Sequence, residues 1–154
     1  LDNLLKLFNK YAAMDEKIQT FLDLNVWKKA HQLVLNIYKV TSTFPATDQF
    51  TLADQLKRSS SLVAASIAEG FQKRNRQEKI KLYNDAQSTL NSVYYLLLLT
   101  RDLKYANTGE LMENTHEVQK MMSGLIRSIS GIPKPVGFKH PTSSFPPMAD
   151  DELM

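Results

Sequence analysis

The sequence contains no cysteine, which excludes disulfide bonds and thiolate metal sites. Glycine (5) and proline (6) are scarce among the 154 residues, so few helix breakers interrupt the chain and long helices are favoured. No apolar run approaches the roughly 20 residues that a membrane helix needs, since the longest covers only residues 93–99. The first residues also lack a basic region followed by an apolar block. We therefore expect no signal peptide, no membrane span and a cytoplasmic protein.

Motifs that carry catalysis or hold a metal are missing as well. The sequence has no Gly-rich phosphate-binding loop and no Gly-x-Ser-x-Gly elbow, and its histidines (His31, His116 and His140) are far apart. Glu113 and His116 form one Glu-x-x-His spacing, but a di-iron bundle needs a second copy on a paired helix. We expect no catalytic residue, no metal and no cofactor, and a protein that binds partners instead of an enzyme.

Four long segments carry apolar residues at helical spacing. They predict helices over residues 25–43, from 51 to about 70, over 76–103 and over 109–130. In the first and last of these, the apolar positions alternate by four and three residues, which is typical of bundle helices that cross at a shallow angle. Connections are short and no strand pattern occurs. The sequence therefore predicts an all-α, antiparallel up-down four-helix bundle over residues 22–131.

The ends of these helices have signals of their own. We expect Thr51 and Asn75 to cap the N-termini of the second and third helices, each with an acidic residue three positions later. Gly70 is expected to stop or kink the second helix, and Gly131 to end the fourth.

Two flanking segments lie outside the predicted bundle. Residues 1–21 form an N-terminal extension in which Leu1, Leu4, Leu5, Phe8 and Tyr11 recur at helical spacing. This pattern is compatible with a short amphipathic helix and equally with a frayed extension. Residues 132–154 contain all but one of the prolines and an acidic Asp-Asp-Glu stretch, so we expect a flexible tail.

The run over residues 93–99 is apolar on every face of its predicted helix. A bundle covers only one side of a helix, so such a run needs cover on a second side. We expect a subunit interface of a homo-oligomer to provide it, and a wholly buried central helix is the alternative. The expected interface residues are Val93, Tyr94, Tyr95, Leu96, Leu97, Leu98 and Leu99.

Cations are concentrated between residues 57 and 81, although the whole chain carries a net charge of only +3. A dense cationic patch attracts phosphate backbones because binding releases their counterions. We expect these side chains to converge near one end of the bundle and to contact nucleic acid, with a solvated basic face as the alternative. The expected contacts are Lys57, Arg58, Lys73, Arg74, Arg76, Lys79 and Lys81.

Several segments, in order, resemble the four-helix-bundle family encoded in 23S rRNA intervening sequences, which is also described as ribosomal-protein-like. Residues 23–31 (DLNVWKKAH) resemble its D-L-x-V-W-K-x-A opening, residues 67–71 (IAEGF) its N-I-A-E-G block, and residues 121–128 (MMSGLIRS) its K-M-L-x-G-L-I-R-S close. The resemblance covers roughly residues 22 to 130. The sequence departs from the family at Ser66, at Gln87 and at Asn91, where the family has Asn, Gly and Glu.

The resemblance implies a non-enzymatic bundle protein. Relatives of this family include accessory proteins of diversity-generating retroelements, which are pentamers that bind a reverse transcriptase and its template RNA through a basic surface. By resemblance, we expect a ring-like homo-oligomer, a pentamer, that binds RNA or RNA/DNA and partners a reverse transcriptase. The alternative is a homo-oligomeric protein–protein scaffold, encoded in an rRNA intervening sequence, with no direct nucleic-acid role.

Overall fold

The computed structural model describes residues 2–7 and 18–131, and these residues form helices and turns with no strand among them. Residues 2–7 are helical and exposed. The remaining positions of the expected N-terminal helix (Leu1, Phe8 and Tyr11) and the expected tail over 132–154 lie outside the described residues. The elements that follow are η1 (Phe21–Asp23), α2 (Asn25–Thr41), η2 (Ala46–Asp48), α3 (Leu52–Gln72), α4 (Arg76–Asp102) and α5 (Gly109–Ser130).

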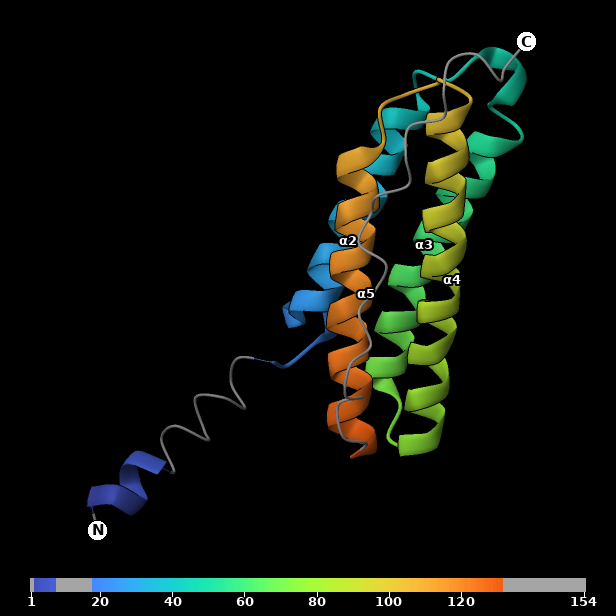
Figure 1. The fold of residues 1–154 in the computed structure, drawn as a ribbon. Coiled ribbons are helices and arrows are strands. Elements are labelled where there is room, and N and C mark those ends of the chain that lie inside the picture. Colours follow the sequence, from blue (N-terminus) through green and yellow to red (C-terminus); the bar gives the residue numbers. More distant parts are fainter. Residues whose placement is uncertain (1, 8–17, 132–154) are drawn as a thin grey trace, which may run out of the picture.

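The four long helices run antiparallel to their sequence neighbours and form one bundle (Figure 1). α3 packs between α2 and α4, and α5 packs against both α4 and α2, so the four helices close around a shared core. This arrangement confirms the predicted up-down bundle. No described helix is both long and apolar enough to cross a lipid bilayer.

The apolar stripes expected from the sequence point into this core. Among the buried side chains of α2, four are spaced by four and three residues, which are Val26, Ala30, Leu33 and Ile37. The other three helices contribute Leu52, Leu56, Val63, Ile67, Tyr83, Ala86, Leu90, Val93, Leu97, Leu111, Val118 and Met122. Because every helix buries one stripe and exposes the opposite face, the hydrophobic effect stabilises the bundle as a unit.

Of the four predicted helix-end signals, two are confirmed and two are corrected. The Asn75 side chain accepts hydrogen bonds from the backbone N–H groups of Gln77 (2.9 Å) and Glu78 (3.2 Å), so it caps α4. Gly131 follows α5 with φ of 68°, a left-handed conformation that favours glycine. The Thr51 side chain makes no capping bond to α3, because its φ of −118° and ψ of −94° lie outside the extended region that N-cap residues adopt. Its hydroxyl donates to the Asp48 carboxylate (3.0 Å).

Gly70 has a different role from the expected stop or kink. It lies inside α3, which continues to Gln72, and it is buried against α4. A Cβ atom at this position would lie 2.6 Å from Cε1 of Tyr83, whose side chain is itself only 1% exposed. Glycine is therefore needed here for the close approach of two helices.

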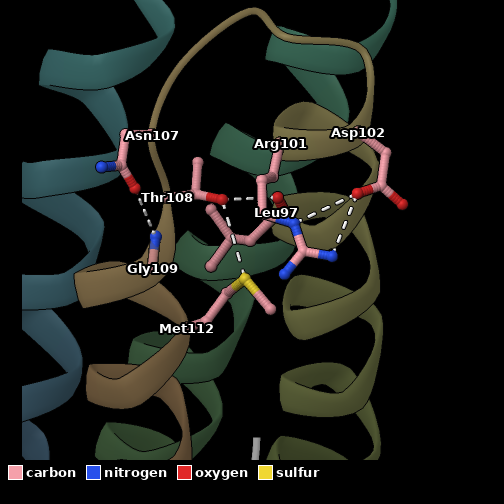
Figure 2. Close-up of polar contacts among 7 residues, drawn as sticks. All are labelled: Leu97, Arg101, Asp102, Asn107, Thr108, Gly109 and Met112. Carbon is pink, nitrogen blue, oxygen red and sulfur yellow. Dashed lines mark hydrogen bonds and ion pairs between the residues drawn. The ribbon is translucent and has the colours of Figure 1, made fainter. Parts of the chain in front are cut away.

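The turn between α4 and α5 is fixed by side chains that hydrogen-bond to the backbone (Figure 2). The hydroxyl of Thr108, which is fully buried, donates to the carbonyl oxygen of Leu97 at 2.7 Å and lies 3.7 Å from the sulfur of Met112. The Asn107 side-chain oxygen accepts from the backbone N–H of Gly109 at 3.2 Å. These bonds satisfy polar groups at the turn and determine that α5 begins at Gly109, as predicted.

The apolar run over residues 93–99 is largely covered by the chain itself. Val93, Leu96 and Leu97 are buried in the bundle core, so they have little or no surface left for a neighbouring subunit. Leu98 and Leu99 are half-buried against the same core, and so is Tyr94, whose ring packs on His116 with centroids 4.4 Å apart. Of the seven expected interface residues, only Tyr95 is exposed, at 59%.

Candidate nucleic-acid interface

The seven expected cations divide between the two ends of the bundle. Lys57 and Arg58 lie in the second turn of α3, whereas Lys73, Arg74 and Arg76 flank its C-terminal end. Along α3, the distance from Arg58 to Lys73 is about 22 Å at 1.5 Å per residue. The expectation that all seven converge is therefore wrong, because an α-helix keeps its two ends apart.

Lys57 and Arg58 make contacts within their own region. The Lys57 ammonium lies 5.4 Å from the ring centroid of Tyr38 on α2. The Arg58 guanidinium forms an ion pair with Asp54 one turn earlier, with Nε and Oδ2 2.8 Å apart. Both side chains are part of a mixed surface of charges and aromatic groups, and they do not extend the cationic cluster at the other end.

The α3–α4 turn gathers the remaining cations. Only residues 73–75 separate the two helices, and the Asn75 cap starts α4 immediately after the turn. Lys73, Arg74 and Arg76 therefore lie together, with both arginines exposed and Lys73 half-buried. We call this the basic end, defined by Lys73, Arg74, Arg76 and Lys79. Lys81 is exposed one turn further along α4.

Lys79 turns inward toward the end of α3. Its ammonium donates a hydrogen bond to the carbonyl oxygen of Phe71 at 2.9 Å, and it lies 5.4 Å from the Phe71 ring centroid and 6.0 Å from that of Tyr83. Partial burial lowers the pKa of Lys79 because the charged form loses hydration. Lys79 thus links α4 to the end of α3, and its ammonium lies against the Phe71 ring.

A hollow of about 430 Å³ opens beside the basic end. It exists because α2 has only 17 residues, against 27 in α4 and 22 in α5. At 1.5 Å per residue, α2 is about 26 Å long and α4 about 40 Å, so three helices continue past the start of α2 (Figure 1). The hollow is lined by Ile18, Leu24, Phe71, Arg74, Arg76, Lys79, Tyr83, Leu125 and Ile129.

The segment before α2 forms one wall of this hollow and is held by Asp23. Its carboxylate accepts hydrogen bonds from the backbone N–H groups of Gln19 and Thr20, both at 3.0 Å. Both bonds lower the pKa of the Asp23 carboxyl, and the bond from Thr20 has the larger effect. The same bonds fix the chain next to Ile18, which lines the hollow although half of its surface is exposed.

A second polar arrangement joins α4 to α5 and involves Gln87 and Asn91. The Gln87 side chain donates to the backbone oxygen of Gln119 (3.0 Å) and to the Ser123 hydroxyl (2.7 Å), and Gln119 donates to the Asn91 side-chain oxygen (2.7 Å). His116 Nδ1 lies 3.0 Å from the Gln119 side-chain oxygen. These bonds hold the two helices in register, which is a structural role.

At the basic end, cationic side chains and the apolar walls of the hollow lie side by side. In residues 2–7 and 18–131, no three side chains of the metal-ligating types converge. Sequence reasoning identified the cations of the basic end but missed the apolar walls. Leu125 and Ile129 continue the apolar stripe of α5, and Ile18 and Leu24 precede the first bundle helix, so no pattern in the sequence indicates that the four meet.

Comparison with known proteins gives a family and a fold. The family of 23S rRNA-intervening sequence proteins matches residues 22–125. A crystal structure from Bacteroides thetaiotaomicron VPI-5482, described as a protein with unknown function from the S23 ribosomal protein family, is 22% identical with a TM-score of 0.61. The alignment covers 66% of this chain and 95% of that one, and at this identity it establishes the fold alone. No curated protein matches the chain.

Proposed function

Because the chain belongs to the 23S rRNA-intervening sequence protein family, we propose that it is a non-enzymatic accessory protein that binds RNA or RNA/DNA. The observation that carries this proposal is the basic end. The α3–α4 turn places Lys73, Arg74 and Arg76 together, and no acidic side chain lies among them in the sequence. Such a cluster attracts phosphates by releasing condensed counterions. Phosphate contacts of this kind position a nucleic acid without selecting its sequence.

The proposal includes a reverse transcriptase as protein partner and a homo-oligomeric assembly. Its support is the resemblance of residues 23–31, 67–71 and 121–128 to the family encoded in 23S rRNA intervening sequences, whose relatives include accessory proteins of diversity-generating retroelements. A reverse transcriptase gene beside the gene for this protein would strengthen it. A ring-like pentamer has a measurable consequence, because its mass in solution would be five times that of the 17.5 kDa chain.

The test is RNA binding across a salt series by the full chain and two charge-matched variants. The first variant, Lys73→Gln/Arg74→Gln/Arg76→Gln, removes three charges from the basic end. It should weaken binding at low salt and reduce the slope of log Kd against log salt by about 2 to 3, since each phosphate contact contributes about 0.7 to 0.9.

The second variant, Lys39→Gln/Lys57→Gln/Arg58→Gln, removes the same charge near the opposite end and is the matched control. This variant should keep most of the affinity for RNA and most of the slope of log Kd against log salt. Equal losses in both variants would show that binding depends on net charge and not on the basic end. No detectable RNA binding at low salt by the unaltered chain would contradict the proposed function itself.

A second candidate function is a protein–protein scaffold, and one observation favours it. Tyr95 on α4 and Leu62 on α3 are 59% and 55% exposed, so two adjacent helices carry apolar side chains on their outer surface. Apolar side chains on the outer surface of a bundle are available to bind another protein. A stable oligomer that binds no RNA would favour this function.

A further inference from the structure

We propose, resting on the proposed function, that the hollow at the basic end receives one unpaired base of an RNA while Arg74 and Arg76 bind its flanking phosphates. The protein would then prefer RNA with a bulged or single-stranded nucleotide over a continuous duplex. The juxtaposition that carries this inference is an apolar hollow directly beside exposed guanidinium groups.

The walls of the hollow are unsuited to phosphate but suited to a base. Six of its nine lining residues are aliphatic or aromatic, contributed by α3, α4, α5 and the segment before α2. A phosphate loses hydration on an apolar wall without gaining hydrogen bonds there, whereas the faces of a base are apolar. The volume of about 430 Å³ lies within the range of about 300 to 1,000 Å³ of small-molecule sites.

The guanidinium groups lie where the flanking phosphates would be. Arg74 and Arg76 line the hollow and are exposed, so their donors remain available at its rim. The Arg76 guanidinium reaches across to the end of α5, because its Nη2 lies 3.9 Å from the position of a Cβ at Gly131. Guanidinium groups bind phosphate oxygens with two parallel N–H donors.

Phe71 gives the hollow an aromatic wall. Its ring lines the hollow, and the Lys79 ammonium lies against it, held by the hydrogen bond to the Phe71 carbonyl oxygen. Because the Lys79 ammonium already lies against this ring, little side-chain entropy is lost when a base packs on it. Base–aromatic contacts of this type tolerate any base, because every base has a π-face.

A duplex cannot use this hollow without disruption. Its bases are stacked and paired inside the helix, so their faces cannot pack against the walls of the hollow. A bulge or a single-stranded nucleotide presents a base that is already unpaired, so the hollow selects such RNA by shape. This selection adds to the sequence-independent attraction of the basic end.

The test compares two RNA hairpins of equal length, one fully paired and one with a single unpaired 2-aminopurine. The unaltered chain should bind the bulged hairpin about tenfold more tightly, and the probe's fluorescence should change on binding.

Two variants that keep all charges should remove this preference while they retain affinity for the paired hairpin. Phe71→Leu removes the aromatic wall, and Ile129→Trp, at a half-exposed position near the end of α5, fills the hollow. Leu103→Trp, on the exposed surface at the opposite end, is the matched control.

The outcomes separate this inference from the proposed function. Equal affinity of the unaltered chain for both hairpins, with no fluorescence change, would overturn the hollow as a base site and leave the basic end as a phosphate-binding surface. A preference for the bulge that persists in Ile129→Trp and in Phe71→Leu would also overturn it. Failure to bind either hairpin would contradict the proposed function.

Discussion

At the scale of single residues, the approach of α3 to α4 depends on Gly70. Gly70→Ala would place a Cβ 2.6 Å from the buried ring of Tyr83 and 3.3 Å from Cβ of Leu82. Overpacking of this kind costs about 1 to 3 kcal/mol, which exceeds the gain in helix propensity of about 0.5 to 1 kcal/mol. We expect a net loss of about 1 to 2 kcal/mol in the free energy of unfolding, measured by urea denaturation.

Gly124 supplies the matched control for this substitution. It lies within α5, where the nearest atom to a new Cβ is Nη2 of Arg127 at 3.9 Å, an ordinary contact. Gly124→Ala should therefore stabilise the protein by about 0.5 to 1 kcal/mol. If both substitutions shifted the midpoint in the same direction, the close contact with Tyr83 would not be the cause.

The hydroxyl of Tyr105 makes the stability of the folded protein decrease at alkaline pH. It donates a hydrogen bond to the Asp48 carboxylate, and this bond raises the pKa of Tyr105, with smaller effects of burial and of the Asp48 charge. The folded state then holds a proton that the unfolded state releases near pH 10, so stability is fully present below pH 10 and falls as pH rises above it.

Tyr105→Phe should flatten this loss, measured as the urea midpoint between pH 8 and pH 11. Part of the slope should persist, because burial also raises the pKa of Tyr83. Tyr95→Phe removes a hydroxyl from an exposed side chain and serves as the control. An unchanged slope in Tyr105→Phe would show that the bond to Asp48 contributes nothing to the pH dependence.

At the scale of helices, the N-terminus of α4 depends on one side chain. Asn75→Ala removes the acceptor for the N–H groups of Gln77 and Glu78 and should destabilise the protein by about 1 kcal/mol. The first turn of α4 should then show faster amide hydrogen exchange. Thr51→Ala is the control, because Thr51 makes no capping bond, and it should change stability by less than about 0.5 kcal/mol. Comparable losses in both would argue against a specific capping effect.

The helices themselves could be predicted well from the sequence. The expected starts at Asn25, Arg76 and Gly109 agree with the structure, because apolar spacing, the Asn75 cap and short polar connections act locally. The role of Gly70 could not be predicted, since it depends on which side chain of another helix lies opposite. Thr51 does not cap α3 because the preceding turn sets its backbone at φ of −118° and ψ of −94°, outside the extended region of N-cap residues.

At the scale of the whole molecule, the candidate site could be predicted only in part. The separation of Lys57 and Arg58 from the basic end follows from the helix rise and was available from the sequence. The hollow was not, because it results from the difference in length between α2 and its neighbours and from Leu24, Leu125 and Ile129 meeting at one end. The interface expected over residues 93–99 stays a prediction, and the extent to which the chain itself covers this run could not be read from its apolar character alone.

The two ends of the bundle are chemically different, which gives the molecule a direction. One end carries Arg74 and Arg76 beside the hollow, and the other carries Phe50, 90% exposed, and Leu103. Copies related by rotation about an axis parallel to the helices would present all their arginines to the same side and act as a platform for one strand. Copies related by a perpendicular two-fold axis would present them to opposite sides and act as a bridge between two strands.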